Sequence, residues 1–180
     1  MTRLAWLSTL VLLLVVLAQV VAVPLVMPGA ARPDLLLVLA VLAGFTGGSR
    51  YGLVMGLAGG LLVDVVTGRF VGLHLLIKGA AGAAGGELAR HVYRENAPAA
   101  LLLAAVATVG QELLHALVLR VFSVVVPLAH VFELLPTIIT GNLVAAGVLF
   151  VPLYRLTRDL AGEPAGRAAG SWPARGGGRR

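Results

Sequence analysis

The sequence predicts an all-α integral membrane protein of about six short transmembrane helices packed in one compact bundle. Of its 180 residues, 59% are hydrophobic and only 12% are charged. The charged share is about half that of an ordinary globular domain, at roughly 25%. The hydrophobic residues also form long runs, separated by short clusters of Pro, Gly and charged residues. A water-soluble fold could not bury such runs, so hydrocarbon is the expected surrounding.

The formal net charge of +6 does not indicate nucleic-acid binding. The basic residues stand at the ends of apolar runs and near the C-terminus, where membrane proteins use them to set orientation and to contact anionic lipid headgroups. We therefore expect membrane lipids as partners and no nucleic acid. The chain contains no cysteine, which excludes disulfides and thiol chemistry.

The first predicted helix runs from Leu4 to Val23 and follows Arg3. At 1.5 Å per residue it can cross a hydrocarbon layer of roughly 30 Å. A cleaved signal peptide is the alternative, but the run is longer than a usual signal core and no clear cleavage site follows it. Four residues are expected to break this helix: Pro24, Pro28, Gly29 and Pro33.

The second predicted helix, Leu35–Gly47, is short and can be capped by Asp34. The other predicted spans are Tyr51–Val66, Val71–Leu88, Pro98–Val121 and Pro136–Tyr154. Residues 122–135 are apolar but contain Pro127, so we expect an extracytoplasmic loop at the membrane interface. The expected domains are a transmembrane domain over residues 1–158 and a disordered, basic, Gly- and Ala-rich cytoplasmic tail over residues 159–180.

Orientation follows from the positions of the cations. With the N-terminus in the cytoplasm, ten arginines fall inside and three outside, namely Arg32, Arg69 and Arg120. This imbalance matches the positive-inside rule. We therefore expect a multi-pass protein of the plasma membrane with both termini cytoplasmic.

Glycines in the third and fourth spans recur at intervals typical of close helix contacts. Their spacing places them on one face of each helix: Gly52, Gly56 and Gly60 in one, and Gly82 and Gly86 in the other. One interpretation is tight packing inside the bundle. The other is a docking face for a partner protein.

Six polar residues inside or at the ends of the spans need a partner or a wet cavity, because each is costly in hydrocarbon. They are Asp64, His74, Lys78, Glu112, His115 and Asn142, and the expected topology puts all six in the outer half of the membrane. Lys78 and Glu112 fall roughly 11 and 13 Å from the outer ends of their helices, so we expect them to form an ion pair. The group is either a structural clamp or a binding cavity open to the outside.

No cofactor, metal ion or enzymatic activity is expected. Glu112 and His115 have the Glu-x-x-His spacing of carboxylate-bridged metal sites, but such sites need a second copy and this sequence has none. The motifs of zinc proteases, serine hydrolases and P-loop nucleotidases are also absent from the sequence.

Several of these residues, taken in order, resemble a known family. The block Arg32-Pro33-Asp34, the glycine-spaced helix that ends at Asp64, and the following Gly68 are similar to the bacterial rod shape-determining protein MreD. The final span fits the resemblance through Pro136, Asn142 and the closing sequence Val-Pro-Leu-Tyr-Arg. The resemblance covers roughly residues 1 to 158.

The resemblance implies a non-catalytic scaffold subunit of the machinery that elongates the cell and builds the lateral peptidoglycan wall. The implied partner is the bitopic protein MreC. Contacts with the RodA polymerase, a class B penicillin-binding protein and MreB filaments would follow, directly or through MreC. The family is also similar in fold to the substrate-binding S components of energy-coupling-factor (ECF) vitamin transporters.

That similarity supplies an alternative function, a substrate-binding membrane subunit of a vitamin uptake transporter. The outer polar residues favour it, since a capturing subunit needs polar groups that converge on the outside. The short loops and few aromatic residues count against it.

Overall fold

The computed structural model describes residues 2–27, 29, 31–68, 72–121 and 128–160. This part of the chain is almost entirely helical and contains no strand, so the protein is an all-α membrane protein as predicted. Six helical rods run side by side. In chain order their elements are α1 (Thr2–Leu17) with η1 (Ala18–Ala22) and α2 (Val23–Val26), α3 (Leu35–Gly47), α4 (Ser49–Thr67), α5 (Leu73–Leu88) with η2 (Ala89–His91), α6 (Ala97–Val121) and α7 (Leu128–Leu160).

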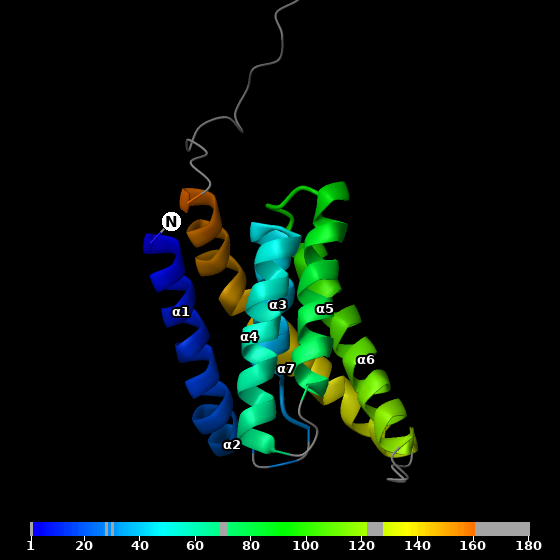
Figure 1. Ribbon diagram of the computed structural model, residues 1–180. Coiled ribbons are helices and arrows are strands. Elements are labelled where there is room, and N and C mark those ends of the chain that lie inside the picture. Colours follow the sequence, from blue (N-terminus) through cyan, green and yellow to red (C-terminus); the bar gives the residue numbers. More distant parts are fainter. Residues whose placement is uncertain (1, 28, 30, 69–71, 122–127, 161–180) are drawn as a thin grey trace, which may run out of the picture.

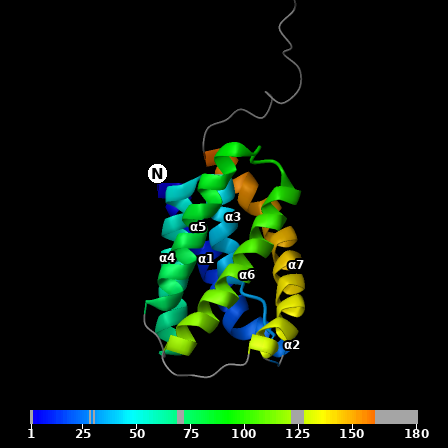
Figure 2. The ribbon, with the colours of Figure 1, turned by 90° about the vertical axis from the view of Figure 1, so that its right-hand side faces the viewer.

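Helix α3 is the centre of the bundle, and all of its residues from Leu36 to Thr46 are buried. It contacts α1, α4, α5, α6 and α7, while α1 stands at the edge beside α3 and α4 (Figures 1 and 2). Its thirteen residues rise only about 20 Å, less than the hydrocarbon thickness. Because the other helices shield α3 from lipid, its length does not have to match the bilayer.

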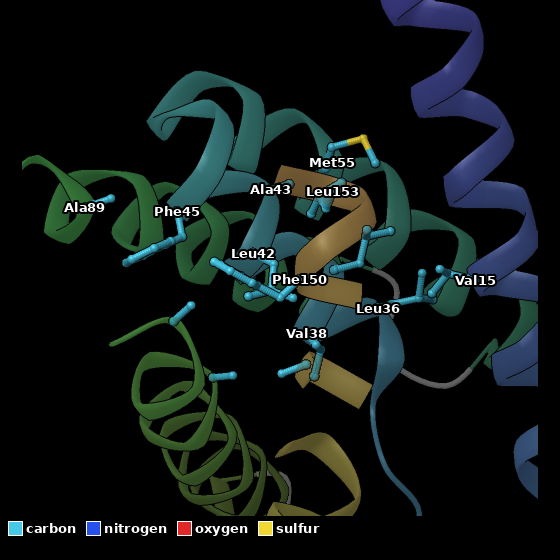
Figure 3. Close-up of a cluster of buried hydrophobic side chains, with 14 residues drawn as sticks. Val15, Leu36, Val38, Leu42, Ala43, Phe45, Met55, Ala89, Phe150 and Leu153 are labelled. Carbon is cyan, nitrogen blue, oxygen red and sulfur yellow. The ribbon is translucent and has the colours of Figure 1, made fainter. Parts of the chain in front are cut away.

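The apolar core lies around α3 (Figure 3). The Phe45 and Phe150 rings are 6.5 Å apart between centroids, and Phe150 stacks on Tyr154 at 6.0 Å. Outside this core, large apolar side chains such as Trp6 and Leu102 remain 76% and 67% exposed. Apolar residues on both the inside and the outside are the distribution that a lipid solvent requires.

Within the described residues, four helical segments are long and apolar enough to cross a membrane: Ala5–Val26, Ser49–Thr67, Ala97–Val121 and Val131–Arg158. The start of α1 and the end of α7 lie at one end of the bundle (Figure 1). We call this end the Arg50 end, because α4 begins there. The opposite end, where α3 begins at Asp34, is called the Asp34 end.

Two predicted helix boundaries are wrong, and both involve proline. The first rod does not break at Pro24, because α1, η1 and α2 follow one another without interruption and Pro24 lies in α2, directly after the π-helical turn. Likewise α7 begins at Leu128 and contains both Pro136 and Pro152, so residues 128–135 are helix and not loop. Proline is tolerated within helices in membranes because neighbouring helices and side chains compensate the lost hydrogen bond.

The predicted loop and tail are only partly described. Residues 122–127 and 161–180, together with the predicted helix start at residue 71, lie outside the described residues. The predicted boundary at residue 158 falls two residues before the described end of α7.

Candidate functional site

Asp34 and Lys78 form a buried ion pair near the Asp34 end of the bundle. Lys78 Nζ on α5 donates to Asp34 Oδ2, and the side chains are 0% and 19% exposed, respectively. The other carboxylate oxygen of Asp34 accepts the Leu37 N–H at 2.9 Å and so caps α3. The predicted pair between Lys78 and Glu112 is therefore wrong. The sequence indicated Asp34 as a helix cap and as part of the family resemblance, but not as the partner of Lys78.

Helix α6 contributes a glutamine that holds both members of this pair. Gln111 Nε2 donates to Asp34 Oδ2 at 2.9 Å, and Lys78 Nζ donates to Gln111 Oε1 at 3.1 Å. Since buried charges are stable only when paired and hydrogen-bonded, the amide completes the surroundings of both ions. It also joins α3, α5 and α6.

Helix α7 enters the same network through Asn142, which is fully buried. Its Oδ1 accepts the backbone N–H of Asp34 at 2.7 Å, and its Nδ2 donates to Thr108 Oγ1 on α6 at 2.8 Å. One turn of α7 also lies against the segment before α3, because a Cβ on Gly141 would meet Pro33 at 3.0 Å. The resemblance motifs Pro33-Asp34 and Asn142 are thus two sides of one contact.

Gln19 ties the first rod to the start of α3. Its Oε1 accepts the Leu35 N–H at 2.7 Å, and its Nε2 donates to Pro33 O at 3.1 Å. Gln19 lies in η1, a π-helical turn, and such turns often occur where a helix adjusts to a specific contact. In the sequence, nothing distinguishes Gln19 beyond its polarity within an apolar run.

Asp64 has a separate role at the same end of the bundle. Its side chain is fully buried, and it accepts three backbone N–H groups at the start of α5: Gly72 at 2.8 Å, His74 at 3.2 Å and Leu75 at 3.0 Å. A carboxylate at a helix N-terminus is favoured by the unpaired N–H groups and by the helix dipole. Between Asp64 and the start of α5, Gly68 ends α4 in the left-handed conformation, at φ 63°.

The remaining polar residues line a cavity of about 470 Å³. His74 and His115 meet edge to face, with ring centroids 5.5 Å apart. Glu112 and Arg32 line the same cavity, together with Gln19, Asp34 and Gln111. The six polar residues singled out in the sequence therefore lie at one end but in two groups. Lys78 and Asn142 belong to the network around Asp34, whereas Asp64, His74, Glu112 and His115 lie at or beside the cavity.

The predicted glycine faces of α4 and α5 lie directly against each other. A Cβ on Gly52 would overlap the Gly82 carbonyl, and a Cβ on Gly56 would overlap the Lys78 carbonyl. Gly60 similarly faces His74, and Gly86 faces Ser49. The two backbones approach at every turn, which brings the Lys78 stem to the centre of the bundle.

The described residues contain no group of three or more His, Asp or Glu side chains arranged to hold a metal ion. Of the other resemblance residues, Arg32 donates from Nε to Met27 O at 3.1 Å. Pro136 lies inside α7, and its carbonyl accepts the Thr140 hydroxyl at 2.8 Å.

Comparison with known proteins identifies a family. The family model for rod shape-determining protein MreD matches residues 1–160, which include every helix of the described structure. No curated protein and no solved structure matches the chain. The match covers the Asp34 network, the Asp64 cap and the glycine contact, so it spans the whole helical bundle. The chain belongs to the MreD family, and is an integral membrane protein of the rod-shape-determining, cell-elongation machinery.

Proposed function

We propose that the chain is a non-catalytic scaffold subunit that binds MreC in the plasma membrane. Through MreC or directly, it would connect with RodA and a class B penicillin-binding protein outside, and with MreB inside. The family match over residues 1–160 is the observation that carries this proposal.

The architecture supports a scaffold rather than an enzyme. Connections within the described bundle are short, such as the single residue Gly48 between α3 and α4 and the few residues between η2 and α6. The buried charges of the Asp34 network hydrogen-bond to each other and fix helix positions. Such an arrangement holds a rigid, membrane-embedded surface that partner helices can contact.

The vitamin-transporter alternative has less support. Among the described residues, the cavity is lined by aliphatic and polar side chains and two histidines, with no Phe, Tyr or Trp to stack on a vitamin ring.

Purification of the tagged full chain from native membranes tests the proposed function. We expect mass spectrometry to find MreC enriched over a purification of an unrelated membrane protein that carries the same tag. Absence of MreC from an intact, folded preparation would contradict the proposal, and a stoichiometric vitamin would favour the alternative.

We further propose that both termini are cytoplasmic. The start of α1 and the end of α7 lie together at the Arg50 end of the bundle (Figure 1). The helix ends and turns on that side contain Arg50, Arg94, Arg155 and Arg158. The positive-inside rule then places the Arg50 end in the cytoplasm. A reporter fused after Arg158 is expected to be protected from protease added outside the cell. A reporter that functions only in the cytoplasm should be active at this position. An external reporter would overturn the orientation.

A further inference from the structure

The cavity at the Asp34 end has two chemically different walls. Aliphatic side chains of the first rod and α4 form one wall, and α5, α6 and the segment before α3 supply polar groups to the other. Two aliphatic lining residues, Val20 and Val66, are 48% and 63% exposed, so this wall continues onto the lipid-facing surface. The volume of about 470 Å³ lies within the roughly 300–1,000 Å³ range of small-molecule sites.

Two opposite charges line this cavity without pairing with each other. In the described part of the chain, Arg32 makes one hydrogen bond, from Nε to Met27 O, so its terminal nitrogens remain available. No basic side chain of the described residues lies within ion-pair distance of Glu112. Asp34 also lines the cavity but is paired with Lys78, and Asp64 is fully buried against the start of α5 and does not line the cavity. A ligand in the cavity would therefore meet one cation and one carboxylate.

The histidines add neutral hydrogen-bonding capacity to the polar wall. His74 Nδ1 is buried and has no hydrogen-bond partner among the described residues. An unpaired buried polar atom costs free energy. Rotation of the ring toward a ligand oxygen in the cavity would remove this cost, and His115 lies edge-on beside it.

We propose that this cavity binds a zwitterionic phosphate ester that carries a primary ammonium, the chemistry of a phosphoethanolamine headgroup. The phosphate contacts the Arg32 guanidinium and the imidazoles, and the ammonium contacts Glu112. For a lipid, the acyl chains leave across Val20 and Val66 into the bilayer. A purely anionic headgroup would leave the Glu112 carboxylate facing another negative charge, so it fits less well. This inference does not depend on the proposed contact with MreC.

Native mass spectrometry of the purified full chain tests the site. The probe is an equal mixture of phosphatidylethanolamine, phosphatidylcholine and phosphatidylglycerol in detergent micelles. We expect one molecule of phosphatidylethanolamine to be retained in preference to the other two. R32Q should weaken retention about tenfold, as expected for the loss of charge-assisted hydrogen bonds. E112Q should reduce the preference over phosphatidylcholine, because the glutamine carbonyl is a weaker acceptor than the carboxylate for the ammonium N–H groups, which a quaternary ammonium lacks.

A soluble probe distinguishes the two sources of this headgroup. Binding of glycerophosphoethanolamine alone, lost in R32Q, would indicate a soluble ligand, whereas binding only of the diacyl form would indicate a membrane lipid. The matched control is R120Q, because Arg120 is exposed near the end of α6 and does not line the cavity. If R32Q unfolds, Arg32→Lys keeps the charge and should retain the selectivity. Equal retention of all three lipids, or unchanged retention in folded R32Q, would overturn the proposal.

Discussion

Replacing Lys78 with methionine is expected to destabilise the bundle by about 3–5 kcal/mol. The ammonium is fully buried and is the cationic partner of Asp34, so its removal leaves a carboxylate among apolar helices with only amide donors. The 19% exposure of the Asp34 side chain lets it keep some solvation, which favours the lower part of this range. The measurement is the free energy of unfolding in mixed detergent micelles titrated with sodium dodecyl sulfate.

A double-mutant cycle separates the ion pair from the general effect of changing two buried residues. Asp34→Asn removes the charge and keeps a side chain that can cap α3. We expect Asp34→Asn with Lys78→Met to cost much less than the sum of the two single changes, because neither charge is then left unpaired.

The originally expected partner of Lys78 provides the control. Glu112→Gln combined with Lys78→Met should show a much smaller coupling energy than the Asp34 cycle, because Glu112 and Lys78 form no ion pair and share only the neutral side chain of Gln111. An additive Asp34 cycle or a strongly coupled Glu112 cycle would contradict the observed pairing.

The sequence was sufficient for much of this fold, because lipid imposes a simple rule on composition. In lipid, a long apolar run must form a helix, because its backbone groups have no water to bond. The predicted span Leu35–Gly47 accordingly agrees with α3 residue for residue. Proline was the main source of error. Pro24 and Pro136 were treated as helix breakers on the basis of soluble proteins, whereas here they lie within helical rods.

The location of the candidate site could be predicted from the sequence, but the residue that pairs with Lys78 could not. Helix topology and rise placed the polar residues at one end, since depth is nearly linear along a helix. Which carboxylate meets Lys78 depends instead on how helices rotate and approach. That rotation is set partly by the glycine contact, where Gly44 of α3 also meets α5, and Gly44 was not singled out in the sequence. Neutral residues such as Thr108 and Gln19 carried no signal beyond their polarity.

Gly82→Ala should be among the most disruptive single methyl additions in the described bundle. At this point α3, α4 and α5 converge, because added Cβ atoms on Gly44 and Gly52 would overlap the Gly82 carbonyl, and one on Gly82 would overlap the Gly52 carbonyl. The obstructing atoms are backbone, which cannot change rotamer to make room. The helices must separate. We expect the free energy of unfolding to fall by about 3 kcal/mol or more, which is at or above the upper end of the range typical of overpacked cores.

Gly110→Ala and Gly147→Ala are the matched controls for this prediction. Both glycines lie in helices, α6 and α7, and a Cβ on either would have nothing within 4 Å in the described structure. Since alanine favours helix over glycine, these changes should leave the free energy of unfolding unchanged or raise it by up to about 1 kcal/mol. Helix separation should also weaken the Asp34–Lys78 pair, so Lys78→Met should cost less in the Gly82→Ala background than in the native chain. Equal stability of Gly82→Ala and Gly110→Ala would show that α4 and α5 do not approach through these glycines.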